Sequence, residues 1–192
     1  AGAVLGINAF DQPNVRESKD NTQRLIREYQ ATGRLPEGKP IAREGALSLY
    51  CDFELNPRTS NAGNAAARGR LREELSAFLN LAVAGDYCAL MAYIKREPAT
   101  ASLLDRVRRR IREKFRVTTT LGYGPRFLHS TGQLHKGGAN NGIFIQITAE
   151  DARDMPIPGE SYTFGTLKKA QASGDLQSLV QHGRRAVRLH IS

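Results

Sequence analysis

YCALMAYI (residues 87–94) and VTTTLGYGP (residues 117–125) are the two stretches that decide the class of fold. The first is an almost unbroken apolar run of strand length, and the second is a β-branched run that ends in a glycine-rich turn. Between them, residues 100–115 place apolar side chains at helical spacing opposite a basic face. A strand, a helix and a second strand in this order predict two parallel strands joined by a crossover helix.

The remaining apolar segments extend this alternation along the chain. Strands are predicted at residues 46–53, 143–148 and 186–191, helices at 64–83, 162–171 and 175–182, and a helical or irregular segment at 126–136. Continuous apolar strands separated by helices are typical of a parallel sheet covered on both faces. We therefore expect an α/β fold, doubly wound around a mainly parallel five-stranded sheet of the flavodoxin-like kind.

The first 40 residues do not fit this repeating pattern. A helix is predicted from Pro13 to about Thr32, with Asp11 as its N-cap and Pro13 in its first turn. Glycines and prolines in residues 33–40 predict a loop after it. We expect residues 1–40 to form an N-terminal helical arm, and residues 41–192 to form the α/β domain.

The charge and the apolar runs exclude several kinds of protein. The net charge is +9, and much of it lies in residues 106–116. We interpret these basic residues as the solvated outer face of a helix, with a surface for a partner or another domain as the alternative. They do not alternate with aromatic residues, so nucleic acid is not an expected partner. No segment has the roughly 18 consecutive apolar residues of a membrane span, so no membrane association is expected.

The two cysteines, Cys51 and Cys88, lie in apolar runs. We expect buried, reduced thiols, as in a cytoplasmic protein. No pair or cluster of cysteine and histidine has the spacing of a structural zinc site, so no metal is expected. The chain opens at Ala1 inside an apolar run, which indicates a cut within a longer protein or a trimmed tag.

Three motifs suggest chemistry. Residues 2–19 read GAVLGINAFDQPNVRESK and end in Lys19, which helical geometry places on one face with Val15, Thr22 and Ile26. A lysine at the edge of an apolar face has either a tunable ammonium group or a stem that simply lies on apolar surface.

The second motif is FLHSTGQLHKGG at residues 127–138, which follows a predicted strand and a glycine-rich turn. Its His129 can act as an acid and a base near neutral pH, or it can be held by a local backbone hydrogen bond. His135 is the competing candidate. The third motif is YTFG at residues 162–165.

These motifs resemble segments of the glucose-6-phosphate isomerase family. Residues 2–19 are similar to the family's C-terminal signature, with Asn14 in place of a glycine and Arg16 in place of a glutamate. Residues 127–138 resemble the segment whose histidine opens the sugar ring, and YTFG resembles a helix start. The order of the motifs differs from that of a simple isomerase. It resembles the C-terminal region of transaldolase–glucose-6-phosphate isomerase fusions.

The resemblance implies a fold of the sugar-isomerase type and the interconversion of glucose 6-phosphate and fructose 6-phosphate, without a cofactor. It implies catalytic roles for Lys19 and His129. The residues expected to contact substrate are Gln12, Arg126, Ser130, Thr131 and Gln133. The expected partners are a sugar phosphate, the remaining isomerase and transaldolase domains, and a second copy in a homodimer.

Two parts of the family's site have no match in this chain. No residue corresponds to the family's catalytic glutamate or to its phosphate loop, although residues 56–64 (NPRTSNAGN) could hold a phosphate or simply form a turn with a helix cap. We therefore expect little or no isomerase activity from this chain alone. The alternative is a non-catalytic domain that binds a sugar phosphate or has a structural role in the fusion enzyme.

Overall fold

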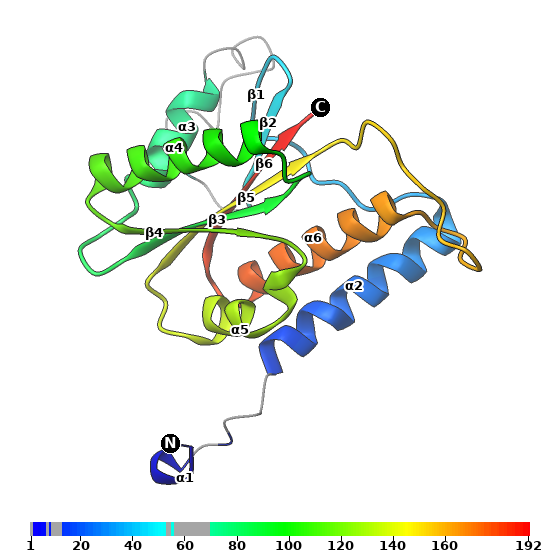
Figure 1. The fold of residues 1–192 in the computed structure, drawn as a ribbon, viewed down its shortest axis with the longest axis horizontal. Helices are drawn as coiled ribbons and strands as arrows, with labels where there is room; N and C mark the ends of the chain where they lie inside the picture. Colours follow the sequence, from blue (N-terminus) through cyan, green and yellow to red (C-terminus); the bar gives the residue numbers. More distant parts are fainter. Residues whose placement is uncertain (1, 7, 9–12, 53–54, 56–69) are drawn as a thin grey trace.

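The computed structural model describes residues 2–6, 8, 13–52, 55 and 70–192, and in this part of the chain one six-stranded sheet runs in the order β1-β2-β6-β5-β3-β4 (Figure 1). The strands are β1 (Ala42–Glu44), β2 (Leu47–Tyr50), β3 (Tyr87–Tyr93), β4 (Thr118–Tyr123), β5 (Gly142–Ala149) and β6 (Arg185–Ile191). The pairs β3–β4, β3–β5 and β5–β6 are parallel. The predicted α/β class and mainly parallel sheet are therefore confirmed.

The predicted count of five strands is wrong, because a hairpin replaces the single strand expected at residues 46–53. Gly45 has a φ of +56°, which glycine adopts without steric cost, and it turns the chain between β1 and β2. The two short strands pair antiparallel with each other, and β2 pairs antiparallel with β6. The hairpin thus extends the parallel sheet by two antiparallel strands at one edge.

Helices cover both faces of the sheet (Figure 1). One face packs on α3 (Arg70–Leu79) and α4 (Pro98–Phe115), and the other on α5 (Ser130–Gly137) and α6 (Phe164–Gln181). The central strand β3 serves both cores, since Leu90 lies in the cluster with Leu104 and Ile111, while Met91 lies in the cluster with Leu179. This alternation follows from the two-residue period of a strand. In the described part of the chain, the remaining helices are α1 (Gly2–Leu5), α2 (Pro13–Thr32) and the 3-10 turn η2 (Arg126–Leu128).

Two short helices were expected at residues 162–182, but the structure has the single helix α6 there. Gly174 does not break the helix, and it lies where α2 crosses closely. A Cβ at this position would lie 2.9 Å from both the backbone nitrogen and the hydroxyl oxygen of Thr22. The glycine was therefore a signal of helix–helix contact rather than of a helix end.

The helix α2 agrees with the predicted range of residues 13–32, but the structure does not confirm a separate arm. Its side chains Val15, Thr22 and Leu25 are buried, and Arg24 donates a hydrogen bond of 2.7 Å to Gln177 of α6. In Figure 1 the helix lies alongside α6. The helix is thus an outer layer on this face of the domain. The predicted N-cap, Asp11, lies outside the described residues.

Candidate functional site

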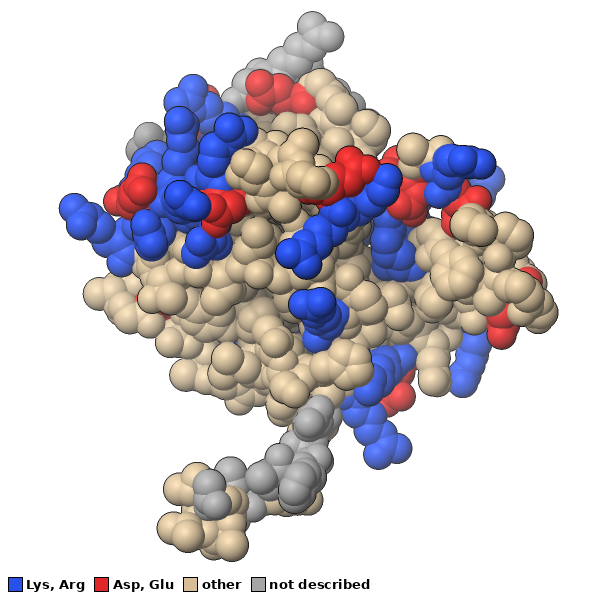
Figure 2. All heavy atoms as spheres, viewed as in Figure 1, with Lys and Arg blue, Asp and Glu red and all other residues tan. Residues whose placement is uncertain are grey.

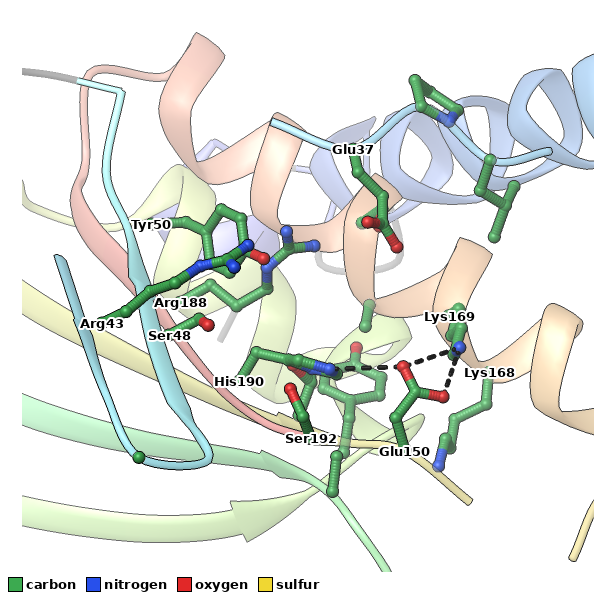
Figure 3. Close-up of a pocket in the computed structure, with 18 residues that line it drawn as sticks. Glu37, Arg43, Ser48, Tyr50, Glu150, Lys168, Lys169, Arg188, His190 and Ser192 are labelled. Atoms are coloured by element: carbon green, nitrogen blue, oxygen red, sulfur yellow. Dashed lines mark hydrogen bonds and ion pairs between the residues drawn. The ribbon is translucent and has the colours of Figure 1, made fainter. Parts of the chain in front are cut away.

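A pocket of about 260 Å³ lies at the edge of the sheet where β5 and β6 end (Figure 3). Its walls are the loop at residues 35–37, the β1–β2 hairpin, the ends of β5 and β6, and the first half of α6. The carboxyl edge of parallel strands is where open α/β sheets bind ligands. The hairpin and the loop close this edge from the side, so the sheet edge becomes a concave site.

Glu150 and His190 form an acid–base pair in this pocket (Figure 3). Glu150 directly follows β5, and its carboxylate lies 3.3 Å from Nε2 of His190. The other imidazole nitrogen, Nδ1, lies 2.9 Å from the Thr148 hydroxyl. Lys169 donates to both oxygens of Glu150, at 3.1 and 2.8 Å. Both side chains of the pair are therefore fixed by hydrogen bonds from neighbouring elements.

These contacts set the charge of the pair. The hydrogen bond from Lys169 lowers the pKa of Glu150, so the carboxylate is ionised at neutral pH. Burial lowers the pKa of His190 despite the opposing charge of Glu150, and Arg188 and Lys169 lower it further. A neutral imidazole beside an ionised carboxylate can exchange protons with a bound ligand.

The hairpin end of the pocket holds guanidinium groups. Arg188 stacks over Tyr50, with its Cζ 4.2 Å from the ring centroid, and Arg43 reaches the same end (Figure 3). Nε of Arg188 is buried and has no hydrogen-bond partner among the described residues. A buried donor without a partner is uncommon in folded proteins, because it forfeits the hydrogen bonds that it made with water. The positive charges of Arg188 and Arg43 make this end of the pocket suited to an anion.

A buried ion pair lies behind the pocket wall. Tyr93, one of the residues that line the pocket, donates a hydrogen bond of 3.3 Å to Asp175. The other oxygen of Asp175 accepts from Lys136, which also donates at 3.3 Å to the carbonyl of Phe127. Lys136 and Asp175 are 0% exposed. Burial raises the pKa of Asp175, against the effect of the Lys136 ammonium. The pair connects α5 to α6 beneath the site.

The structure places the predicted catalytic residues elsewhere. Lys19 is exposed on α2, although Val15 and Thr22 on the same side of the helix are buried. His129 is exposed just before α5. Neither residue lines the pocket at the carboxyl edge. Their roles stay predictions.

Four of the five predicted substrate-contacting residues, Arg126, Ser130, Thr131 and Gln133, do not line the pocket. Arg126, Ser130 and Thr131 are exposed, and Gln12 lies outside the described residues. Gln133 joins two of the motifs: its amide donates at 2.7 Å to Asn14 Oδ1 and accepts at 3.1 Å from the Asn14 backbone N–H. Gln133 thus holds the start of α2 against α5.

The competing histidine, His135, is buried between aromatic rings. Its ring centroid lies 5.1 Å from that of Phe144 and 5.9 Å from that of Phe127. Burial, with a smaller effect of the adjacent Lys136, lowers its pKa to about 4. A neutral imidazole in this setting acts as a core side chain.

The YTFG motif begins α6. The hydroxyl of Thr163 accepts a hydrogen bond of 3.1 Å from the backbone N–H of Thr166, which caps the helix. Asp154 accepts a further bond of 2.7 Å from the backbone of Gly165. A polar residue that satisfies the first free N–H groups of a helix stabilises its start. The motif therefore orients the helix that supplies Lys168 and Lys169 to the pocket.

The basic residues predicted to be solvated lie on the outer surface of α4. Figure 2 shows lysine and arginine side chains gathered over this helix, with few acidic ones between them. Asp105 pairs with Arg108 and Arg109, at 2.7 and 2.5 Å. Among the described residues, no helix is long and apolar enough to cross a membrane. In the same part of the chain, no group of three His, Cys, Asp or Glu side chains could hold a metal.

Sequence reasoning missed Glu150 and His190, although a signal for Glu150 was present. Glu150 comes at the carboxyl end of a predicted strand, where side chains of an α/β sheet reach the ligand edge. The signal for His190 was weaker: it lies two residues after Arg188, so both share one side of β6. The hairpin that closes the pocket had no comparable signal.

Comparisons with known proteins support the fold. The structure of a hypothetical protein from Thermus thermophilus matches 61% of this chain, with a TM-score of 0.52 and 20% identical residues. The match covers 32% of the length of that protein. At this level of identity the likeness shows the fold alone. No protein-family model matches the chain, and no curated protein matches it.

Proposed function

We propose that this chain is part of an aldose–ketose isomerase of the glucose-6-phosphate isomerase type, and that it binds a sugar phosphate in the pocket at the carboxyl edge. One observation supports this most: a single pocket holds an ionised carboxylate beside a neutral imidazole, together with the guanidinium group of Arg188. The sequence motifs at residues 2–19 and 127–138 point to the same class of enzyme.

The chemistry requires an acid and a base that act on neighbouring atoms. Isomerisation moves a proton between C2 and C1 of the open-chain sugar, so a carboxylate must take the proton from one carbon and return it to the other. Glu150 fits this role because the hydrogen bond from Lys169 keeps it ionised. His190 fits proton exchange with a sugar oxygen, because it is neutral and within reach of Glu150.

We further propose that the complete site needs residues outside this chain. The family's phosphate loop has no counterpart here, and the predicted Lys19 and His129 lie away from the pocket on the exposed surface. In a fusion enzyme these residues would face the remaining isomerase domain or a second copy of the chain. Turnover by this chain alone should therefore be far below that of a complete isomerase.

The first test is binding and turnover by this chain. Isothermal titration with fructose 6-phosphate should detect binding, and a coupled assay should detect little or no conversion to glucose 6-phosphate. Turnover equal to that of a complete isomerase would refute the incomplete site. No binding of fructose 6-phosphate would refute the proposed substrate.

The rival function is a domain that binds a sugar phosphate without acting on it. In an enzyme that contains this chain and turns over, Glu150→Gln should lower kcat by at least about a hundredfold, the usual contribution of a general base. Glu113→Gln, an exposed position on α4, is the matched control. An unchanged kcat in the Glu150 variant would favour the non-catalytic domain.

A further inference from the structure

We infer that Arg188 binds the phosphate group of the sugar phosphate, so that the ligand lies with its phosphate at the hairpin end and its reacting carbons at Glu150 and His190. This inference rests on the proposed function, and it adds the direction of the ligand in the pocket.

Arg188 differs from the other arginines of the same segment. Arg184 donates to the carbonyl oxygens of Lys136 and Gly138. Arg185 forms an ion pair of 2.8 Å with Asp86. Arg188 pairs with none of the described carboxylates, and its buried Nε has no partner among them. Arg184 and Arg185 therefore have structural partners, whereas the guanidinium of Arg188 is left for a ligand.

The guanidinium of Arg188 is held in place before a ligand arrives. Its position over the Tyr50 ring, 4.2 Å from the centroid, restricts the long side chain. Tyr50 comes from β2 and Arg188 from β6, and these two residues are register partners in the sheet. A planar guanidinium that is already oriented loses less entropy when it binds the oxygens of a phosphate.

A second hollow of about 150 Å³ shares Arg188, Tyr50, Pro36 and Ser173 with the pocket. Arg188 therefore lies at the junction of the two hollows. Arg43 on one side and Lys39 on the other add positive charge. Besides Glu150, the walls of the two hollows include the carboxylates of Glu37 and Asp52.

This balance of charge favours one anionic group at the junction over one in each hollow. Glu37 and Asp52 would repel a second phosphate placed beside either of them, whereas their oxygens can accept hydrogen bonds from sugar hydroxyls. We therefore expect a monophosphate to be preferred over a bisphosphate.

The opposite end of the pocket disfavours a phosphate. Glu150 is ionised there, and Lys169 is already paired with it. Arg188 and His190 are two residues apart on β6 and share one side of the strand. A ligand with its phosphate at Arg188 therefore extends along β6 toward Glu150 and His190.

The test compares ligands on the intact chain and on Arg188→Gln by isothermal titration. Charge-assisted hydrogen bonds contribute about 1.5–3 kcal/mol, so the affinity for inorganic phosphate and for fructose 6-phosphate should fall by roughly 10- to 150-fold. Arg110→Gln, an exposed change of equal charge on α4, should leave both affinities within about twofold.

A second variant distinguishes a lost phosphate contact from unfolding of the Arg188→Gln chain. Arg188→Lys keeps the charge but not the planar fork, and it should lie between the intact chain and Arg188→Gln in phosphate affinity. Equal phosphate affinity in the intact chain and in Arg188→Gln would overturn the inference, as would no phosphate binding by the intact chain. Phosphate binding that depends on Arg188, without binding of fructose 6-phosphate, would uphold the phosphate site and refute the proposed function.

Discussion

Replacing Lys136 by methionine removes the cation from a carboxylate that water does not reach, since both partners are 0% exposed. Asp175 would then be buried and charged, or it would take up a proton. Protonation of Asp175 sets an upper limit on the loss of stability. The ordinary pKa of an aspartate carboxyl is 3.8, and at 1.36 kcal/mol per pH unit the protonation of a free carboxylate costs about 4.4 kcal/mol at pH 7. We expect a loss of about 3–4 kcal/mol in the free energy of unfolding at pH 7.

The same reasoning predicts how the loss depends on pH. At pH 5 protonation costs only about 1.6 kcal/mol, so the loss should shrink accordingly. Urea unfolding of the intact chain and of Lys136→Met at both pH values measures it. Lys168→Met removes the cation of a half-buried surface pair with Asp151 and should cost at most about 1 kcal/mol. An equal loss of stability for Lys136→Met at pH 7 and pH 5 would refute the reasoning. It would mean that Asp175 is already protonated in the intact chain.

The double variant Lys136→Met/Asp175→Leu separates the ion pair from the packing. Replacing both partners by apolar side chains removes the desolvation cost along with the attraction, so the double variant should be more stable than Lys136→Met. It should stay below the intact chain, because the Tyr93 hydroxyl and the Phe127 carbonyl lose their partners. Urea unfolding at pH 7 measures this recovery. A double variant that is no more stable than Lys136→Met would show that apolar side chains do not pack well at these two positions.

Three further predictions concern the same face of the domain. Gly132→Ala should lower the melting temperature by several degrees, because its Cβ would lie 1.6 Å from the carbonyl oxygen of Phe127; an unchanged melting curve would contradict this. Stability should fall as the pH drops from 6.5 to about 4, because burial lowers the pKa of His135 and only the unfolded chain binds its proton in that range; His135→Phe should flatten the profile in urea unfolding. Gln133→Ala should cost about 1–3 kcal/mol, because the backbone N–H and Oδ1 of Asn14 lose their partner, and a loss below about 0.5 kcal/mol in urea unfolding would argue against that contact.

The parallel part of the fold could be predicted because its signals are local. The run at residues 87–94 is apolar throughout, and the structure buries β3 between neighbours on both sides. The hairpin could not be predicted in the same way, since β1 has only three residues and just one of them, Ala42, is buried. Gly174 was ambiguous for a related reason. A glycine that admits a neighbouring helix has the same local signal as one that ends a helix.

The pocket depends on contacts between residues far apart in the sequence. Glu150 becomes part of a pair only because β5 and β6 are parallel neighbours, which brings His190 beside it. Arg188 is held at the pocket only because β2 and β6 pair, which brings Tyr50 beside it. The sequence motifs predicted His129 instead, which is exposed and lies between β4 and β5, just before α5.

The location of the sugar-phosphate site is the central claim, and titration of the backbone amide NMR spectrum with fructose 6-phosphate tests it most directly. The account predicts that shifts concentrate at residues 148–150, 168–173 and 188–190, which surround the pocket. Shifts centred on residues 126–133 and Lys19 would place the site at the sequence motifs. Either that pattern or a spectrum that does not change would contradict the account.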